Sequence, residues 1–359
     1  MICWWEPCYA AIAILSRITE TGENMPGMEM HIGDPVPPFT QKASTNSGIC
    51  AFDTAGGRHI LFFFFSSSTD PEVEQALKEI SYYKNVLNRP DCMFFGVSLD
   101  AGDVTRLRKR PDLSSVCFLY DADRKCHNLF GVPAGASPRW VEVDPMMHVC
   151  GHFPHSSGAT DMAFRALMKR ASQPKPYVPV PALILEHVLE PAFCKTLIHY
   201  HQSHDPYPSP ILTADAIGNP LRMVVPHFKR RLDTPIREKK LVMDLQGRII
   251  RRVVPEIFRV FRFKASQMDR MLISSYDAQD QGFFNAHRDN TVPTSAHRQF
   301  AVSINLNDDY QGGELVFPEF SDQAFSAPAG GAIIFSCALL HAVRPVTHGR
   351  RYACLPFVY

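Results

Sequence analysis

The sequence predicts two domains: an α/β domain, then a mainly-β domain with supporting helices. Three observations lead to this prediction. The chain has 359 residues, about the length of two ordinary domains. Residues 173–181 hold four prolines; because proline neither continues a helix nor donates to a central strand, this segment should be an extended linker. Strand-like and helix-like segments alternate before it, whereas short strand-like segments separated by turn residues dominate after it.

These patterns divide the chain into four parts. Residues 1–29 are a leader that we expect to be poorly ordered, 30–172 the first domain, 173–181 the linker and 182–359 the second domain, with its core over 270–359. The leader has an apolar centre but no Lys or Arg before it, so it does not fit a secretory signal. Later methionines are alternative first residues: Met25, Met28 and Met30.

Composition excludes several classes of protein. Lys and Arg number 37 against 36 Asp and Glu, a net charge of +1, so we expect no non-specific binding of nucleic acid. No apolar run reaches the roughly 20 residues that cross a bilayer, so we expect no membrane span. The ten cysteines form no C-x-x-C pair, which argues against a disulfide framework or a structural zinc site. We expect reduced thiols in a cytoplasmic protein.

The first domain should contain a sheet that is buried on both faces. Residues 60–65 form a continuous apolar run, as expected of such a strand. Residues 71–87 carry apolar side chains at near-helical spacing. Further strands are predicted at 93–99, 117–120 and 140–144. Strands that alternate with helices in this order predict parallel strand pairs.

The second domain should begin with helices and continue as a barrel or sandwich. One helix is predicted over 191–201, and another behind Thr234-Pro235, with Thr as the cap and Pro in the first turn. Pro255 should kink this second helix. Its apolar stripe comprises Val242, Leu245, Ile249, Val253, Ile257 and Phe261. The predicted strands are 271–276, 299–306, 313–317, 331–335 and 352–358.

One histidine motif suggests a metal site. Of fifteen histidines, only His287 begins an H-x-D or H-x-E triplet, which ends at Asp289. Alternate residues of a strand point to the same side, so both side chains could face one ion. Two imidazoles and one carboxylate, with open positions opposite, are the ligands of non-haem Fe(II) oxygenases.

The third ligand should be a histidine downstream of Asp289. The candidates are His297, His341 and His348, and we favour His341, 52 residues beyond Asp289. We expect His297 and His348 not to bind metal. Arg351 follows His341 by ten residues, and its guanidinium could bind a carboxylate through two parallel hydrogen bonds.

With these residues in place, the second domain resembles the prolyl 4-hydroxylase-like family of Fe(II)/2-oxoglutarate oxygenases. The resemblance covers about residues 180–359 and is strongest from 270. It is carried by Tyr276, Gly282-Phe283-Phe284, His287-Arg288-Asp289, the stretch from Gly312 to Pro318, and the stretch from Leu340 to Tyr352.

This resemblance implies a double-stranded β-helix (jelly roll) and a set of site residues. His287, Asp289 and His341 match the catalytic iron ligands, Arg351 matches the residue that binds the distal carboxylate of 2-oxoglutarate, and Tyr276 lies near a tyrosine that contacts this cosubstrate. Such enzymes use O2, convert 2-oxoglutarate to succinate and often need ascorbate. Halogenating relatives have a small residue at the position of Asp289, so hydroxylation is the expected outcome.

The first domain resembles the peroxiredoxin-like thioredoxin-fold family over about residues 30–150. The matching segments are 33–39, 60–65, 96–100 and 121–124. A peroxiredoxin needs a thiolate at the start of the helix that follows its first central strand. Residues 66–73 contain no cysteine, so we expect no peroxidase activity and instead a binding or docking module.

Two basic clusters remain. The run Lys229-Arg230-Arg231 could line an active-site mouth or lie on the surface, and the sequence leaves this open. Arg248, Arg251 and Arg252 fit a solvated helix face.

The leading hypothesis is an Fe(II)- and 2-oxoglutarate-dependent hydroxylase of a peptidyl side chain or a small molecule. The alternatives are a thiol-dependent redox or peroxidase-like protein and a non-catalytic binding protein. The missing cysteine counts against the first alternative, and the complete triad with Arg351 counts against the second. The sequence indicates neither the substrate nor the oligomeric state.

Overall fold

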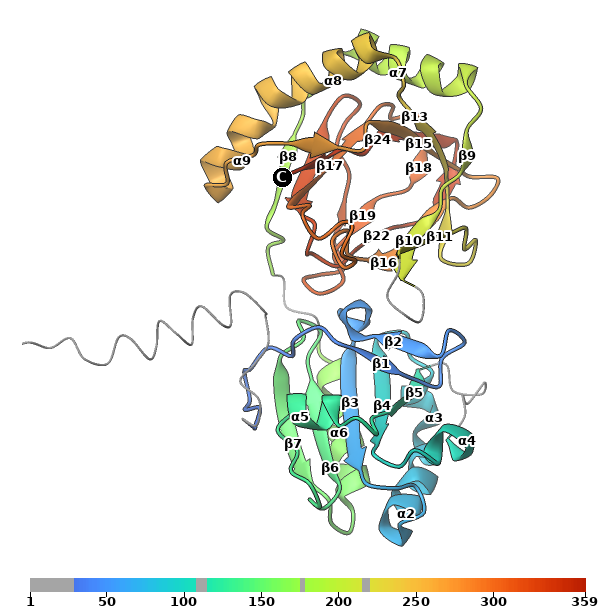
Figure 1. Ribbon diagram of the computed structural model, residues 1–359, viewed down its shortest axis with the longest axis vertical. Helices are drawn as coiled ribbons and strands as arrows, with labels where there is room; N and C mark the ends of the chain where they lie inside the picture. Colours follow the sequence, from blue (N-terminus) through green and yellow to red (C-terminus); the bar gives the residue numbers. More distant parts are fainter. Residues whose placement is uncertain (1–28, 108–114, 175–177, 215–219) are drawn as a thin grey trace, which may run out of the picture. The chain divides into compact units, whose positions relative to one another are not determined.

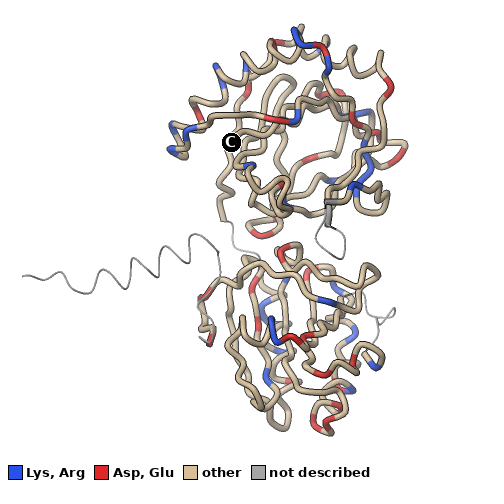
Figure 2. Tube along the Cα trace, viewed as in Figure 1, with Lys and Arg blue, Asp and Glu red and all other residues tan. Residues whose placement is uncertain are grey.

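The computed structural model describes residues 29–107, 115–174, 178–214 and 220–359, which form two compact units that divide at residue 175 (Figure 1). The predicted leader, apart from Glu29, lies outside the described residues, as does the middle of the predicted linker. The described linker residues contain neither helix nor strand. In each unit, acidic and basic residues are interspersed along the chain (Figure 2).

The first unit is built on a five-stranded sheet in the order β5-β4-β3-β6-β7. Its strands are β3 (His59–Phe65), β4 (Cys92–Ser98), β5 (Val116–Tyr120), β6 (Arg139–Val143) and β7 (Val149–Pro154). The first three are mutually parallel, as predicted, whereas β6 runs antiparallel to β3 and β7 antiparallel to β6. With helices on both faces, this is the thioredoxin fold.

Alternating burial explains the four consecutive phenylalanines of β3. Phe62 and Phe64 pack into one apolar cluster, and Phe63 and Phe65 pack into another on the opposite face of the sheet. The helix predicted over 71–87 is interrupted, since Ser81–Tyr83 form a 3-10 turn between two α-helices. The remaining elements are β1 (Thr40–Lys42), β2 (Ile49–Ala51), η1 (Phe52–Ala55), α2 (Pro71–Ile80), η2 (Ser81–Tyr83), α3 (Lys84–Leu87), α4 (Asp103–Arg106), α5 (Lys125–Leu129) and α6 (Ala159–Ala171).

The second unit is a double-stranded β-helix formed by two main sheets. The larger has the order β14-β25-β17-β24-β15-β13-β9, with β21 joining β17 to β8, and the smaller has the order β12-β16-β22-β19-β20. Two short two-stranded sheets, β10–β11 and β18–β23, accompany them. The strands are β8 (Ala182–Leu185), β9 (Tyr207–Pro208), β10 (Ile211–Ala214), β11 (Pro220–Met223), β12 (Lys229–Arg230), β13 (Leu232–Pro235), β14 (Met268–Asp269), β15 (Leu272–Asp277), β16 (Phe283–His287), β17 (Phe300–Asn305), β18 (Gln311–Gly312), β19 (Leu315–Val316), β20 (Ala324–Phe325), β21 (Ala332–Ser336), β22 (His341–Val343), β23 (Val346–His348), β24 (Arg350–Cys354) and β25 (Phe357–Val358).

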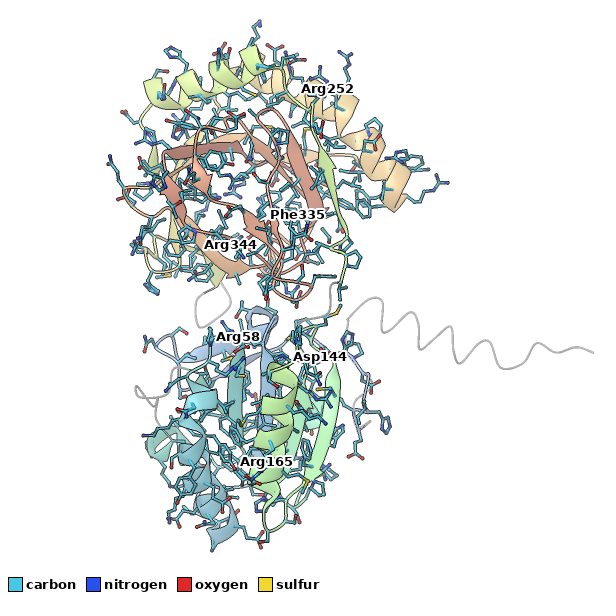
Figure 3. The ribbon with its side chains drawn as sticks, turned by 180° about the vertical axis from the view of Figure 1, so that it is seen from behind. Arg58, Asp144, Arg165, Arg252, Phe335 and Arg344 are labelled. Carbon is cyan, nitrogen blue, oxygen red and sulfur yellow. The ribbon has the colours of Figure 1, made fainter. Side chains whose placement is uncertain are left out.

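Two apolar clusters hold this unit together. One packs helices α7 (Pro191–Ser203), α8 (Lys239–Arg252) and α9 (Val254–Phe261) against the larger sheet. The other cluster lies between the sheets and includes Tyr276, Phe317 and Phe335. Figure 3 labels Phe335 among the strands and Arg252 on α8. The helices therefore support the outside of the larger sheet, while its inner face is available to form a site.

The structure corrects the predicted start of the long helix. Thr234 and Pro235 do not open it but end β13, where Thr234 pairs with Ile273 of β15. The helix α8 begins at Lys239 instead. Pairing of β13 with β15 therefore decided the structure of this segment, in spite of its helix-capping sequence. The predicted interruption at Pro255 is confirmed, because α8 ends at Arg252 and this proline lies in the first turn of α9.

The last predicted strand is also divided. Residues 352–358 form the end of β24 and all of β25, with Leu355 and Pro356 between them. Since proline lacks an N–H group, it cannot continue the ladder, and β25 pairs with β14 and β17. No helix within the described part of the chain is long and apolar enough to span a membrane. The eight cysteines of the described residues are all free thiols.

Candidate metal centre

The smaller sheet brings two histidines together. His287 is the last residue of β16, His341 is the first residue of β22, and the two are paired across the ladder. Asp289 lies two residues beyond the end of β16, in a bend, so the prediction that it shares a strand with His287 is wrong. Its backbone N–H donates to the carbonyl of Cys337 at 3.0 Å. This bond anchors the bend beside the histidines.

The three side chains form a group that could hold one ion. One ligand atom from each residue lies within 4.8 Å of the ligand atoms of the other two. Asp289 Oδ1 is 3.5 Å from His287 Nε2, and its Oδ2 is 3.4 Å from His341 Nε2. Each histidine Nδ1 lies next to a backbone carbonyl, of Asn285 at 2.8 Å and Leu339 at 3.0 Å. Because a carbonyl only accepts, each Nδ1 must donate, which leaves both Nε2 lone pairs free for a metal.

Burial and neighbouring charges keep Asp289 and His341 in the protonation states that metal binding requires. Burial, reinforced by the neighbouring His287, lowers the pKa of His341 to about 4, so its imidazole is neutral at physiological pH. Burial alone would raise the pKa of Asp289, but His341 and His287 outweigh it and hold that pKa below its ordinary value. The site therefore offers the carboxylate of Asp289 and the neutral imidazole of His341 beside the ring of His287.

A buried arginine lies on the larger sheet, in the same pocket as the triad. Arg351 is only 3% exposed. Its Nε and Nη2 donate to Asn305 Oδ1 at 3.0 and 2.9 Å, and Nη2 also donates to Ser303 Oγ at 3.2 Å. Among the described residues it has no carboxylate partner, and its Nη1 makes no hydrogen bond. The neighbouring Arg350 instead faces outward and pairs with Asp277.

Tyr276 lies in the same pocket and is almost fully buried. Its ring packs beneath the Arg351 guanidinium, 5.4 Å from centroid to Cζ. Its hydroxyl oxygen accepts a hydrogen bond from Arg231 Nη1 at 3.1 Å, which leaves the hydroxyl hydrogen free to donate to a ligand. The empty space of the pocket, including the part open to solvent, is about 430 Å³, and its walls are mostly apolar.

The sequence of this region matches the model of the 2OG-Fe(II) oxygenase superfamily over residues 271–359. That range contains the triad, Tyr276 and Arg351. The C-terminal part of the chain is a 2OG-Fe(II) oxygenase domain. The sequence is also similar to curated proteins described as PKHD-type hydroxylases. One from a Synechococcus species is 34% identical over 95 residues, which are 24% of this chain and 42% of that protein.

A second PKHD-type hydroxylase, from a Polaromonas species, is 44% identical over 58 residues, 16% of this chain and 26% of that protein. The chain thus spans less than half the length of these relatives. Among solved structures, a Pseudomonas putida prolyl-4-hydroxylase is 14% identical with a TM-score of 0.39, covering 49% of this chain and 91% of that one. AhpC of Mycobacterium tuberculosis is 18% identical with a TM-score of 0.33, covering 40% of this chain and 95% of that one.

The remaining predicted histidines lie outside the metal group of the oxygenase domain. His348 is exposed on β23, and His297 lies 3.8 Å from Asp269 with 43% of its side chain exposed. Neither belongs to the group formed by the triad. Of the cluster expected on a solvated helix face, only Arg251 is exposed; Arg248 and Arg252 are half-buried on α8, and both pair with Glu190.

The basic run before β13 divides into three environments. Lys229 is buried and donates from Nζ to the Pro210 carbonyl at 2.9 Å. Arg230 is exposed, whereas Arg231 lines the pocket. Arg270 also lines the pocket, and sequence reasoning missed it. A single arginine ahead of a predicted strand carries no motif that could have revealed it.

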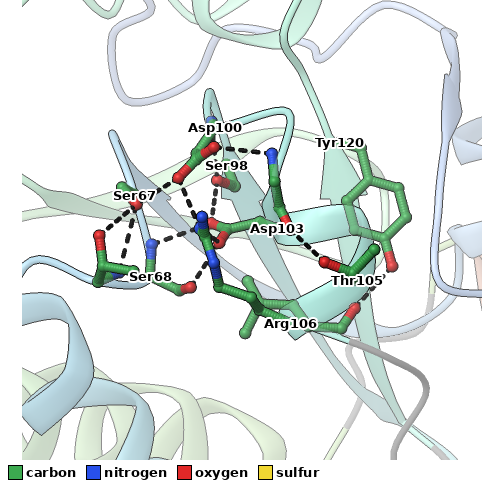
Figure 4. Close-up of polar contacts among 11 residues, drawn as sticks. Ser67, Ser68, Ser98, Asp100, Asp103, Thr105, Arg106 and Tyr120 are labelled. Atoms are coloured by element: carbon green, nitrogen blue, oxygen red, sulfur yellow. Dashed lines mark hydrogen bonds and ion pairs between the residues drawn. The ribbon is translucent and has the colours of Figure 1, made fainter.

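In the first unit, the turn that should carry a peroxidatic thiol is filled by hydroxyls and carboxylates (Figure 4). Asp103, fully buried, accepts hydrogen bonds from the backbone and hydroxyl of Ser68, from the hydroxyl of Ser98 and from Arg106. Ser67 donates to Asp100. The polar groups of this turn bind one another, and no thiol is among them.

Proposed function

We propose that the chain is an Fe(II)- and 2-oxoglutarate-dependent hydroxylase. The observation that carries this proposal is that two sites share one pocket: the group formed by two imidazoles and one carboxylate, and a buried arginine without a carboxylate partner among the described residues. The family match and the similarity to PKHD-type hydroxylases support it.

His287, Asp289 and His341 would hold Fe(II) through Nε2, a carboxylate oxygen and Nε2. Bound iron would supply O2 activation, coupled to the decarboxylation of 2-oxoglutarate to succinate. The carbonyls of Asn285 and Leu339 fix both rings by accepting from Nδ1. Because the protein supplies three ligands, other coordination positions of the ion would remain available for the oxygen chemistry of non-haem iron.

Arg351 would bind the distal carboxylate of 2-oxoglutarate. Its Nη1 hydrogens are free within the described structure, and Asn305 and Ser303 hold the guanidinium in place. Tyr276 would add a second donor from its hydroxyl. Apolar walls that include Phe284, Phe335 and Val343 would exclude water and so strengthen this charge pair.

Two further assignments belong to the proposal. Ascorbate would return oxidised iron to Fe(II) after turnovers that do not hydroxylate a substrate. The first unit, whose turn at Ser67 and Ser68 lacks a thiol, would serve as a binding module rather than a peroxidase. The substrate of the hydroxylase is a peptidyl side chain or a small molecule.

The test is an anaerobic titration of the full chain with Fe(II) and then 2-oxoglutarate, followed by exposure to O2. We expect a charge-transfer absorption band when the keto acid chelates the bound iron, and then iron-dependent formation of succinate. Absence of both the band and succinate would refute the proposed function.

A further inference from the structure

Arg270 lines the pocket of the oxygenase domain, yet no part of the proposed function uses it. It lies between β14 and β15 with a left-handed backbone, φ 60°. Residues other than glycine adopt this conformation infrequently. The ladders on either side, β14 with β25 and β15 with β24, hold the turn in place. The fold therefore fixes the point at which this guanidinium enters the pocket.

Arg270 has few partners in the part of the chain that the structure describes. Its ion pair there is with Asp233, and the distance from Nη2 to Oδ2 is 3.7 Å, too long for a hydrogen bond. Arg231 already binds the same carboxylate at 2.8 and 3.1 Å, and Ser209 and Ser274 donate to it as well. The Arg270 guanidinium makes no hydrogen bond to described residues, although only 22% of its side chain is exposed. Its N–H donors are therefore available to a ligand.

Each of the other arginines near the pocket has an acidic partner or an assigned anionic ligand. Arg231 is bound by Asp233, and Arg351 is assigned to the distal carboxylate of 2-oxoglutarate. Farther out, Arg298 pairs with Asp269 and Arg288 pairs with Glu319. Arg270 has only the 3.7 Å pair with Asp233, whose carboxylate is bound more closely by Arg231.

A count of the charges in the occupied pocket also indicates that Arg270 needs an anionic partner. With Fe(II) bound, the ion and the pocket residues Arg231, Arg270 and Arg351 carry five positive charges. Asp233, Asp289 and the two carboxylates of 2-oxoglutarate carry four negative charges. Burial lowers the pKa of Lys229 to about 5, so that amine is uncharged at neutral pH and does not alter the count. One positive charge remains unbalanced in a largely apolar pocket, and charge is costly in such surroundings.

We infer that the substrate of the proposed hydroxylase is an anion whose carboxylate or phosphate group binds the Arg270 guanidinium. This inference rests on the proposed function, because the charge count includes bound iron and 2-oxoglutarate. The planar fork of arginine matches two oxygens of either group. The guanidinium also packs against the Phe357 ring, 5.4 Å from Cζ to the centroid, on an apolar wall that weakens competition from water.

The experiment uses two small oxyanions as probes, acetate and methylphosphonate, with acetamide as the uncharged control. The full chain is loaded with Mn(II) in place of iron and saturated with 2-oxoglutarate, so that Arg351 is occupied. Paramagnetic relaxation of each probe's methyl protons then reports binding close to the metal. We expect acetate or methylphosphonate to bind and acetamide not to bind, and the preferred probe distinguishes a carboxylate from a phosphate substrate.

Variants show whether Arg270 is responsible. We expect Arg270→Gln to weaken oxyanion binding at least about tenfold while 2-oxoglutarate still binds. Arg230→Gln removes the same charge from an exposed position outside the pocket and should bind the probes like the wild type. If Arg270→Gln fails to fold, Arg270→Lys serves instead: it keeps the charge beside Asp233 but lacks the fork, so probe binding should weaken with 2-oxoglutarate binding retained.

The possible failures can be told apart. If 2-oxoglutarate does not bind to the Mn(II)-loaded wild type, the proposed function fails, and the inference fails with it. If 2-oxoglutarate binds but neither oxyanion does, or if the oxyanions bind equally well to the Arg270 variants through the metal alone, only the inference about the substrate is overturned.

Discussion

Arg351 donates two hydrogen bonds, from Nε and Nη2, to the single side-chain oxygen of Asn305. An amide oxygen carries no net charge, so Asn305 orients the guanidinium without neutralising it. A carboxylate at the same place would hold the arginine equally well but would satisfy its charge. The pair therefore keeps a buried cation ready for an anionic ligand.

The first prediction concerns Arg351→Ala. Loss of a buried, charge-assisted pair costs about 2 kcal/mol or more, so the apparent 2-oxoglutarate requirement should rise by roughly 30-fold or more. Iron binding should change little because no ligand is lost. The measurement is a 2-oxoglutarate titration of succinate formation. Arg350→Ala is the matched control, since Arg350 faces outward and pairs with Asp277; a larger defect in that variant would place the cosubstrate elsewhere.

The second prediction concerns Asn305→Asp. The new carboxylate would keep the geometry of Asn305 and neutralise Arg351, so 2-oxoglutarate should bind at least about tenfold more weakly, or about 1.4 kcal/mol. Asn307→Asp is the control. This residue lies two positions after Asn305, and its side chain contacts Asp309 and the Arg350 carbonyl instead. Equal effects of the two substitutions would show that charge near Arg351 does not matter.

The third prediction concerns the metal. Asp289→Ala should abolish iron-dependent succinate formation and lower bound iron, because one of three protein ligands is lost. The fold should persist, since the bend is held through the backbone of Asp289 and Cys337. Metal analysis and circular dichroism check the two parts. Asp308→Ala, an exposed carboxylate, is the control, and full activity in Asp289→Ala would contradict the triad.

The fourth prediction concerns peroxide. We expect no thiol-dependent peroxide reduction at Cys50 or Cys92, both of which are buried. A hydrogen bond with Cys117, followed by burial, raises the pKa of Cys50, and burial raises the pKa of Cys92 to about 11. Both thiols thus stay protonated and unreactive at neutral pH. The assay follows peroxide with dithiothreitol as reductant; consumption that disappears in Cys92→Ser would overturn this prediction.

The fifth prediction concerns Glu142, a fully buried carboxylate on β6 whose Oε1 lies 3.1 Å from Arg170 Nε. Burial raises its pKa despite this arginine. The folded state therefore holds the proton more tightly than the unfolded state. The resulting stabilisation is complete below the ordinary pKa of 4.5 and is lost as pH rises through the folded pKa.

Glu142→Gln should accordingly be more stable relative to the wild type at pH 8 than at pH 4. Urea unfolding at both values measures the two differences. Glu72→Gln, an exposed change on α2, should show no such trend. A constant difference between wild type and Glu142→Gln would mean that the pKa of Glu142 is the same in the folded and unfolded states.

The strands of the first unit were predictable because their signal is continuous. The run from Ile60 to Phe65 can be buried only in the middle of a two-faced sheet, and β3 begins one residue earlier. Thr234 and Pro235 carried an equally good helix-opening signal and still became strand. Their partner Ile273 is distant in the sequence, so no local pattern could have revealed it.

The site likewise contains residues that the sequence could predict and one that it could not. Four site residues could be predicted because they follow a family motif with recognisable spacing: His287, Asp289, His341 and Arg351. The structure brings all four into one pocket. The strand argument for Asp289 was nevertheless wrong, since a bend places it there. The position of Arg270 in the pocket depends on a left-handed turn and on two strand ladders. No local sequence pattern predicts either feature.

The hydroxyl-filled turn of the first unit also bears on whether a peroxidase could be restored by a single substitution. A cysteine in place of Ser68 would meet the carboxylate of Asp103, and the turn holds two carboxylates, Asp100 and Asp103, against one guanidinium of Arg106. A nearby negative charge raises a thiol pKa, whereas a peroxidatic thiolate needs a cation. Ser68→Cys alone would therefore yield a protonated, inert thiol. Asp100, two residues after β4, and Asp103, at the start of α4, would therefore oppose peroxidase chemistry in addition to the missing cysteine.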